Sequence, residues 1–182
     1  MAQYNIIAEN ENYTIVSDYE AVYRTSEKYQ TEAQLEQELI KNLTEQGYEY
    51  LAIHTEKDLV DNLRVQLQRL NDYTFTDSEW ERFFNDVIAN PNEGIEAKTA
   101  KIQEDHIQVL KRDTGETKNI YLIDKRNIHN NYLQVINQYE EEQGNHDARY
   151  DVSILVNGLP LVHIELKRRG VQLKEAFNQI DR

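Results

Sequence analysis

The sequence has no cysteine, two prolines and six glycines among its 182 residues, and these scarcities exclude several classes of protein. Without cysteine the chain can form neither a disulfide framework nor a thiolate zinc site. So little proline and glycine, with 39% hydrophobic residues, excludes collagen-like, low-complexity and disordered chains. The glycines never compose G-x-x-x-x-G-K-[ST], G-x-G-x-x-G or G-x-S-x-G, so no P-loop, Rossmann fingerprint or hydrolase elbow is encoded. We expect one globular domain, or a fragment of a longer protein.

Basic residues are also scarce, with 20 Lys and Arg against 33 Asp and Glu, and the net charge of −13 repels polyanions. Residues 149–182 hold six basic and four acidic residues, so residues 1–148 carry −15 and only the C-terminal fifth has a bias that a phosphate could use. The five histidines never fall at H-x-x-x-H spacing, which disfavours a transition-metal site. No basic segment followed by an apolar run stands near Met1, so we expect a cytoplasmic protein without membrane contact.

Apolar residues recur at helical spacing in four segments of the first hundred residues. Two of the segments follow capping boxes, Thr31-x-x-Gln34 and Thr76-x-x-Glu79, which mark helix starts. Gly47 stands where a helix C′ residue is expected. The predicted helices cover residues 31–46, 57–71, 77–90 and 95–104, and a further helical pattern begins near Val171.

After residue 105 the hydrophobic period changes to about two, which is typical of strands. The predicted strands cover residues 106–112, 118–124, 131–139, 149–156 and 161–167, separated by Gly- and Asn-containing turns. Helices followed by consecutive strands and another helix predict an α/β (α+β) fold, with a central mixed sheet flanked by helices.

The last predicted strand carries the residues with the clearest chemistry. Alternation sends Val162, Ile164 and Leu166 to one face and His163, Glu165 and Lys167 to the other. Two carboxylates beside an ammonium suit Mg²⁺-assisted phosphodiester cleavage, because carboxylates hold a cation that keeps its waters and the lysine stabilises developing negative charge. An Asp on the preceding strand, Asp151, is the second carboxylate. The alternative is an ion pair on a solvated sheet face, worth about 0–1 kcal/mol.

The triplet E-x-K is not specific, because it also occurs at Glu96 and at Glu116. The geometry of the hairpin between the two strands decides whether Asp151 can reach Glu165. A regular two-residue turn at Asn157-Gly158 pairs Asp151 with Ile164 and puts it on the apolar face. A longer connection or a bulge instead sets Asp151 opposite Glu165 and Ser153 opposite His163. Pro160 cannot donate to a ladder, so we favour the irregular connection.

The stretch from Asp151 to Lys167 also fits the PD-(D/E)xK nuclease pattern. Together with other segments, it resembles the N-terminal endonuclease domain of the R subunit (HsdR) of type I restriction-modification enzymes, across residues 1–182. The other matching segments are YQTE at 29–32, QGYE at 46–49, DSEW at 77–80, IYLID at 120–124, RYDV at 149–152 and VNGLPLV at 156–162.

This resemblance implies a restriction-endonuclease-like domain that cleaves double-stranded DNA with Mg²⁺, for which Mn²⁺ can substitute. It also implies a longer subunit, whose ATP-dependent translocase domains lie outside these 182 residues, and partner subunits for specificity and methylation. ATP would serve only those missing domains.

The resemblance further assigns roles to individual residues. Asp151 and Glu165 would be metal ligands and Lys167 the catalytic lysine, while Gln179 fits the first position of a Q-x-x-x-Y element. A carboxylate on the first helix would approach the metal, with Glu32 and Glu36 as candidates, although a solvated capping role is the alternative for both. The expected DNA contacts are Lys167, Arg168, Arg169 and Lys174.

The acidic balance leaves a second function open, since it disfavours DNA affinity. One explanation is that other subunits deliver the DNA to a weakly binding nuclease. The rival is a non-catalytic docking module or an acidic DNA mimic, in which the −15 of residues 1–148 is the functional surface.

Overall fold

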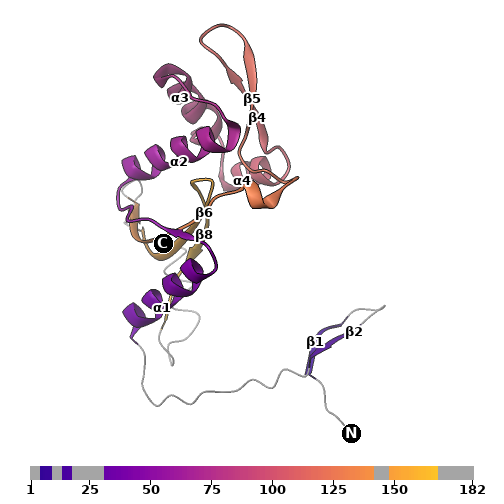
Figure 1. Ribbon diagram of the computed structural model, residues 1–182, viewed down its shortest axis with the longest axis vertical. Helices are drawn as coiled ribbons and strands as arrows, with labels where there is room; N and C mark the ends of the chain where they lie inside the picture. The colour runs from indigo at the N-terminus through magenta and orange to yellow at the C-terminus, as the bar shows by residue number, and fades with distance from the viewer. Residues whose placement is uncertain (1–4, 10–13, 18–30, 142–147, 168–182) are drawn as a thin grey trace.

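The computed structural model describes residues 5–9, 14–17, 31–141 and 148–167 (Figure 1). Two short strands near the start of the chain pair with each other as an antiparallel hairpin, β1 (Asn5–Glu9) and β2 (Thr14–Ser17). The other elements, in chain order, are α1 (Glu32–Glu45), β3 (Glu49–Tyr50), α2 (Glu56–Asn71), α3 (Asp77–Phe83), the π-helix η1 (Phe84–Ile88), α4 (Ile95–Gln103), β4 (Ile107–Lys111), β5 (Thr117–Tyr121), the 3₁₀-helix η2 (Ile128–Asn130), β6 (Leu133–Glu141), β7 (Ala148–Val156) and β8 (Leu159–Ile164).

Among the described residues, the main sheet has four strands in the order β3-β6-β7-β8. β3 runs parallel to β6, and the other pairs are antiparallel, so the sheet is mixed. Residues of α1, such as Leu43, pack with Val135 and Val152 on one face, while Leu59 of α2 packs with Ile136 and other residues of the opposite face. Figure 1 shows α1 and α2 on the two sides of the sheet. The predicted α/β class, with a mixed sheet flanked by helices, is confirmed.

Each of the four helices predicted before residue 105 is present. Both capping boxes form: the hydroxyl groups of Thr31 and Thr76 accept from the third helical backbone N–H, and the backbone N–H of each threonine donates to the side chain of that third residue. The predicted helix 77–90 ends as an α-helix at Phe83 and continues as a π-helix to Ile88. Phe83 and Phe84 both pack in one apolar cluster with Trp80, as their spacing of three and four residues from Trp80 predicts. Among the described residues, no helix is both long and apolar enough to cross a bilayer.

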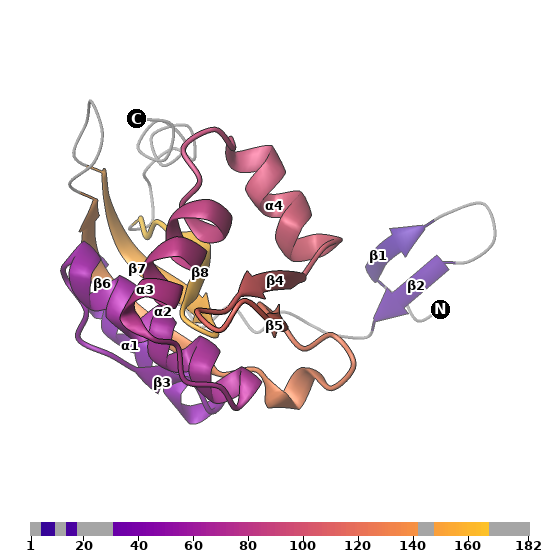
Figure 2. The same ribbon diagram turned by 90° about the horizontal axis from the view of Figure 1, so that it is seen from above.

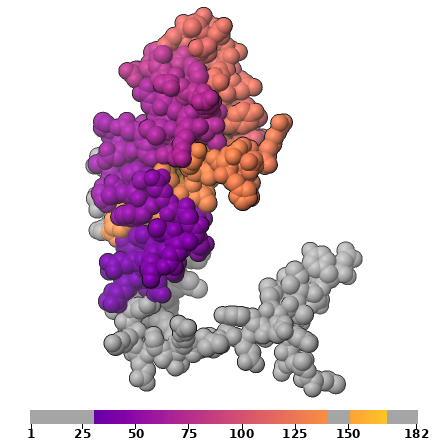
Figure 3. All heavy atoms as spheres, viewed as in Figure 1, coloured from indigo at the N-terminus to yellow at the C-terminus, as the bar shows by residue number. Residues whose placement is uncertain are grey.

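The expectation of one sheet is wrong for β4 and β5, which form a separate two-stranded hairpin. Leu110 and Ile120 face inward from this hairpin into the cluster that contains Phe75 of the α2–α3 loop. The side chain of Asn71, at the end of α2, bonds both backbone groups of Tyr121 and so occupies the edge of β5. Figure 2 shows this hairpin beside α4, and Figures 1 and 3 show it at the end of the described main body that lies away from α1.

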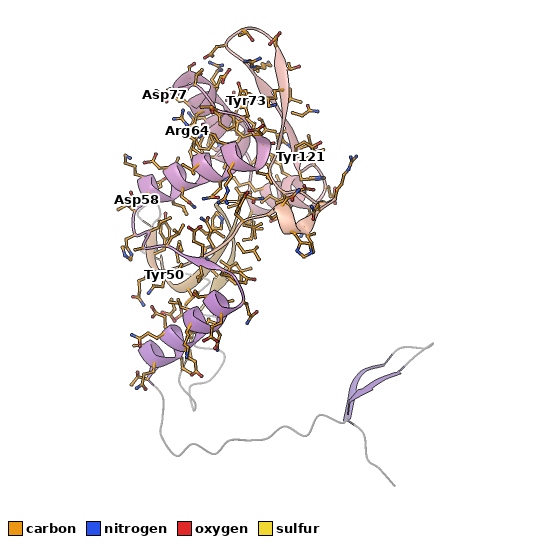
Figure 4. All side chains as sticks on the ribbon, viewed as in Figure 1. Tyr50, Asp58, Arg64, Tyr73, Asp77 and Tyr121 are labelled. Atoms are coloured by element: carbon orange, nitrogen blue, oxygen red, sulfur yellow. The ribbon has the colours of Figure 1, made fainter. Side chains whose placement is uncertain are left out.

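Polar bonds fasten α3 to its neighbours. Arg64 of α2 donates to Asp77 over 2.8 Å, and Figure 4 shows the two side chains next to each other. Asp113, in the β4–β5 turn, accepts from the hydroxyl groups of Ser78 and Thr76 and from the guanidinium of Arg82. These bonds lower the pKa of Asp113 to about 2.

Candidate active site

The hairpin that carries the predicted site combines a two-residue turn with a bulge. Asn157 and Gly158 have φ of 52° and 82°, as a type I′ turn requires, and Val156 pairs with Leu159. The register then shifts, because Leu155 pairs with Pro160 but Ile154 pairs with Val162, which leaves Leu161 as the extra residue. The tight turn and the bulge, which are alternatives in the prediction from sequence, are both present.

Because of the bulge, polar residues of β7 and β8 face each other, as the irregular connection predicted. Ser153 pairs with His163, and the Ser153 hydroxyl lies 2.8 Å from Nδ1 of the His163 ring. Val152 pairs with Ile164, so the next facing positions belong to Asp151 and Glu165. The predicted apolar face is present in part: Ile164 and Leu166 pack against the cluster of Leu43, Val135 and Val152. Val162, the third residue predicted for this face, is exposed instead.

Glu165 and Lys167 form an ion pair that is largely removed from water. Nζ of Lys167 donates to Oε1 of Glu165 over 2.5 Å. The side chain of Lys167 is 19% exposed and that of Glu165 is 9% exposed. Burial alone would lower the pKa of Lys167. Its hydrogen bond to Glu165 and the negative charges of Glu165, Glu32 and Asp151 outweigh burial, so the pKa of Lys167 lies above its ordinary value. The lysine therefore stays charged at neutral pH.

Asp151 reaches the same place from the neighbouring strand. Its Oδ2 accepts from the backbone N–H of Leu166 over 2.8 Å, directly between Glu165 and Lys167 in the chain. The charges of Asp151 and Glu32 both act on Lys167. Asp151 of β7 thus meets the segment after β8 that carries the ion pair of Glu165 and Lys167.

Glu36, one turn after Glu32 on α1, lies in a different environment. It is 9% exposed, and its two oxygens accept from the side-chain amides of Asn137 and Gln138, each over 2.5 Å. A carboxylate with both oxygens occupied by amides is poorly suited to a solvated capping role. Glu32 is the exposed member of the pair and the one whose charge acts on Lys167.

Two carboxylates, Asp151 and Glu165, are the oxygen donors that a hard divalent cation such as Mg²⁺ would use here. A larger group of three or more His, Asp or Glu side chains that could hold a metal ion is not present among the described residues. Mg²⁺ is commonly held by one or two carboxylates, with waters and substrate phosphate completing its shell. Within the described part of the chain, Asp151 uses Oδ2 and Glu165 uses Oε1, which leaves one oxygen of each for a cation.

Several residues implied by the resemblance lie outside the described residues. They are Arg168, Arg169, Lys174 and Gln179. Asn137 and Gln138, which bond Glu36, were not predicted as site residues, although the strand register sets Gln138 opposite Asp151. The available signal was two consecutive polar residues between Ile136 and Tyr139, which interrupts the alternation of a buried strand.

Comparison with known proteins gives a consistent set of relatives. The family described as "Type I restriction enzyme R protein N terminus" matches residues 29–182. The chain is 48% identical over 177 residues to the type I restriction enzyme EcoprrI endonuclease subunit of Escherichia coli, which covers 97% of this chain and 56% of that protein.

Two staphylococcal proteins are similar as well. The chain is 40% identical over 159 residues to the SsaAORF53P endonuclease subunit of Staphylococcus saprophyticus and 39% identical over 161 residues to the SauCOLORF180P endonuclease subunit of Staphylococcus aureus strain COL. Each alignment covers 85% of this chain and 16% of the relative. The chain thus spans about half of one curated relative and about a sixth of the others.

Proposed function

Because the chain belongs to the family of type I restriction enzyme R protein N termini, we propose that it is the DNA endonuclease domain of an R subunit. It would cleave double-stranded DNA by Mg²⁺-dependent phosphodiester hydrolysis, in the cytoplasm. The observation that carries this proposal is the grouping of Asp151, Glu165 and Lys167 at one end of the β7–β8 hairpin. Without that grouping, family membership alone would leave the reaction of this segment open.

Asp151 and Glu165 would hold the metal ion through their remaining oxygens. When bound, Mg²⁺ supplies an activated water and neutralises phosphate charge. The protein's own part is electrostatic and positional. Lys167, kept charged by Glu165 and neighbouring carboxylates, would donate to the scissile phosphate, where negative charge develops in the transition state. The backbone N–H of Leu166 holds Asp151 in place for this arrangement.

The acidic surface is consistent with a nuclease that receives its substrate from elsewhere. A net charge of −13 gives weak affinity for free DNA. We therefore propose that an ATP-driven translocase in the longer subunit delivers the DNA, and that specificity and methyltransferase subunits hold the recognition site.

Alanine substitutions in the assembled enzyme test the proposal. Lys167→Ala should slow DNA cleavage by about 10²–10³-fold, as loss of a charge-stabilising donor does, and Asp151→Ala by at least as much. ATP hydrolysis and translocation should stay near the wild-type rate, because the motor lies elsewhere. Equal loss of both activities would instead favour a docking role, and unchanged cleavage in Asp151→Ala would end the nuclease assignment.

A further inference from the structure

Gln138 of β6 has a backbone conformation that is unusual for a residue with a side chain. Its φ is +55°, in the left-handed region that non-glycine residues seldom adopt. Residues held in this region persist only where surrounding contacts enforce them, and they concentrate at functional sites. Gln138 lies in the interior of β6, not in a turn, so the strand itself contains a residue with positive φ.

The position of Gln138 places this conformation next to the proposed metal site. Bonded pairs between β6 and β7 run as far as Asn137 and Val152 and resume, in the same register, at Tyr139 and Tyr150. Gln138 therefore occupies the position that faces Asp151. On the other side of β7, the position that faces Asp151 belongs to Glu165.

The left-handed backbone conformation of Gln138 changes the direction of its side chain. Successive residues of a regular strand point to opposite faces, so Asn137 and Gln138 should diverge. Both instead reach Glu36 on α1, on the face where Val152 packs. Since Val152 points to the α1 face, alternation puts Asp151 on the other one. The side chain of Gln138 is thereby kept off the face on which Asp151 lies.

Glu36 supplies the contacts that hold this arrangement. It is a carboxylate with 9% exposure, and each of its oxygens accepts one amide N–H over 2.5 Å, which are short charge-assisted hydrogen bonds. The hydroxyl of Tyr50 donates to Oδ1 of Asn137 over 2.9 Å and so fixes which way that amide points; Figure 4 labels Tyr50 between α1 and α2. Asn137 is therefore tied to both β3 and α1, and the strained Gln138 beside it is tied to α1.

We propose that Glu36, Asn137 and Gln138 form a clamp that positions Asp151, by holding Gln138 left-handed so that its side chain stays away from the face of the metal site. This inference rests on the proposed nuclease function. It makes Gln138 and Glu36 positioning residues, which act through Asp151 and do not touch the reacting atoms.

Two substitutions at Gln138 separate the backbone conformation from the side chain. Gln138→Gly adopts positive φ without strain and needs no clamp, whereas Gln138→Val disfavours positive φ because its side chain is β-branched. Asp72→Val is the matched control. Asp72 also has positive φ, 44°, but it caps the end of α2 beside Asn71, which bonds β5 of the separate hairpin, so its strain should lower the melting temperature alone.

The measurements use the full-length R subunit that contains this chain. Mn²⁺ binding is followed by electron paramagnetic resonance, without nucleotide and with a non-cleavable phosphorothioate duplex present, and Asp151→Ala defines the background. In the assembled enzyme, the Mg²⁺ concentration for half-maximal DNA cleavage is the second readout. We expect Gln138→Val and Glu36→Ala to lower the affinity for Mn²⁺, and to raise the Mg²⁺ concentration for half-maximal cleavage, by at least tenfold each. Both quantities should stay within threefold of the wild-type values in Gln138→Gly and Asp72→Val.

The outcomes distinguish this inference from the function on which it rests. In one outcome the wild type binds Mn²⁺ and cleaves DNA, Asp151→Ala does neither, and Gln138→Val behaves like Asp72→Val. The clamp is then wrong and the nuclease assignment stands. Equal losses in Gln138→Gly and Gln138→Val would also overturn the clamp, since the backbone conformation would then be irrelevant. If Asp151→Ala cleaves DNA like wild type, the proposed function itself has failed.

Discussion

Gly158, in the turn of the β7–β8 hairpin, offers a quantitative test of how closely the hairpin packs against α2. A Cβ built on Gly158 would lie 2.6 Å from the Cα of Leu63 and 3.1 Å from its backbone N. Both atoms belong to the backbone of α2, which cannot move aside as the end of a flexible side chain can. Gly158 also has φ of +82°, so Gly158→Ala adds backbone strain to the steric clash.

Gly115 provides a matched reference for the size of the effect. Its φ is +86°, and a Cβ there would meet nothing within 4 Å. Gly115→Ala should therefore cost only the left-handed backbone penalty, about 1–2 kcal/mol. Gly158→Ala carries the same penalty and a forced separation of turn and helix, which adds about 1–3 kcal/mol as overpacking does. The expected total is about 2–5 kcal/mol.

Urea denaturation of the two variants and the parent chain measures the difference directly. Thermal unfolding gives a second measure, at roughly 2–4 °C of melting temperature per kcal/mol for a chain of this size. The difference between the two variants isolates the contact with Leu63 from the backbone strain. Equal losses for Gly158→Ala and Gly115→Ala would refute the close approach of the turn to α2.

Three other predictions concern single side chains. Asn157→Ala should destabilise the chain by about 2–5 kcal/mol in urea denaturation, because the buried amide donates to the Leu122 carbonyl and accepts from the Tyr132 N–H; a loss under about 1 kcal/mol would contradict this. The pKa of Asp113 is lowered from 3.8 to about 2, so its stabilising contribution is complete above the unfolded value and is lost as pH falls through the folded one. Asp113→Asn should accordingly flatten the loss of stability between about pH 4 and pH 2 in acid titrations followed by circular dichroism, and parallel curves would count against it. If Lys167 acts on the phosphate as proposed, Lys167→Arg in the assembled enzyme should lose DNA cleavage at saturating Mg²⁺, because a planar guanidinium would not fit in the place of a compact ammonium; cleavage at the wild-type rate would leave Lys167 only a general electrostatic role.

The helices were predictable because their signals are local. Capping boxes at Thr31 and Thr76 and leucines at helical spacing act within one or two turns of the chain. The strands β4 to β8 were also predicted, but their assignment to sheets was not. Whether β4 and β5 join the main sheet depends on contacts with residues such as Phe75 and Asn71, which lie far away in sequence. The two-residue β3 is too short to give a periodic signal.

The candidate site was predictable in its residues and only partly in its geometry. Alternation along β8 indicated which side chains share a face, and the facing of Ser153 and His163 followed from the bulge. The left-handed conformation of Gln138 could not be foreseen, because glutamine has no preference for it and Glu36, which holds it, lies 102 residues away. Strained residues of this kind depend on tertiary contacts rather than on local propensity.

The register of the proposed site depends on the opposite end of its hairpin. A two-residue turn without a bulge would set Asp151 opposite Ile164, since a one-residue slip moves every side chain of a strand to the other face. The extra residue, Leu161, restores the facing of Asp151 and Glu165, and the turn that precedes it is fixed by the contact of Gly158 with Leu63. A change that lifts the turn from α2 therefore frees the hairpin to slip, and the carboxylates would separate although none of their own contacts had been altered.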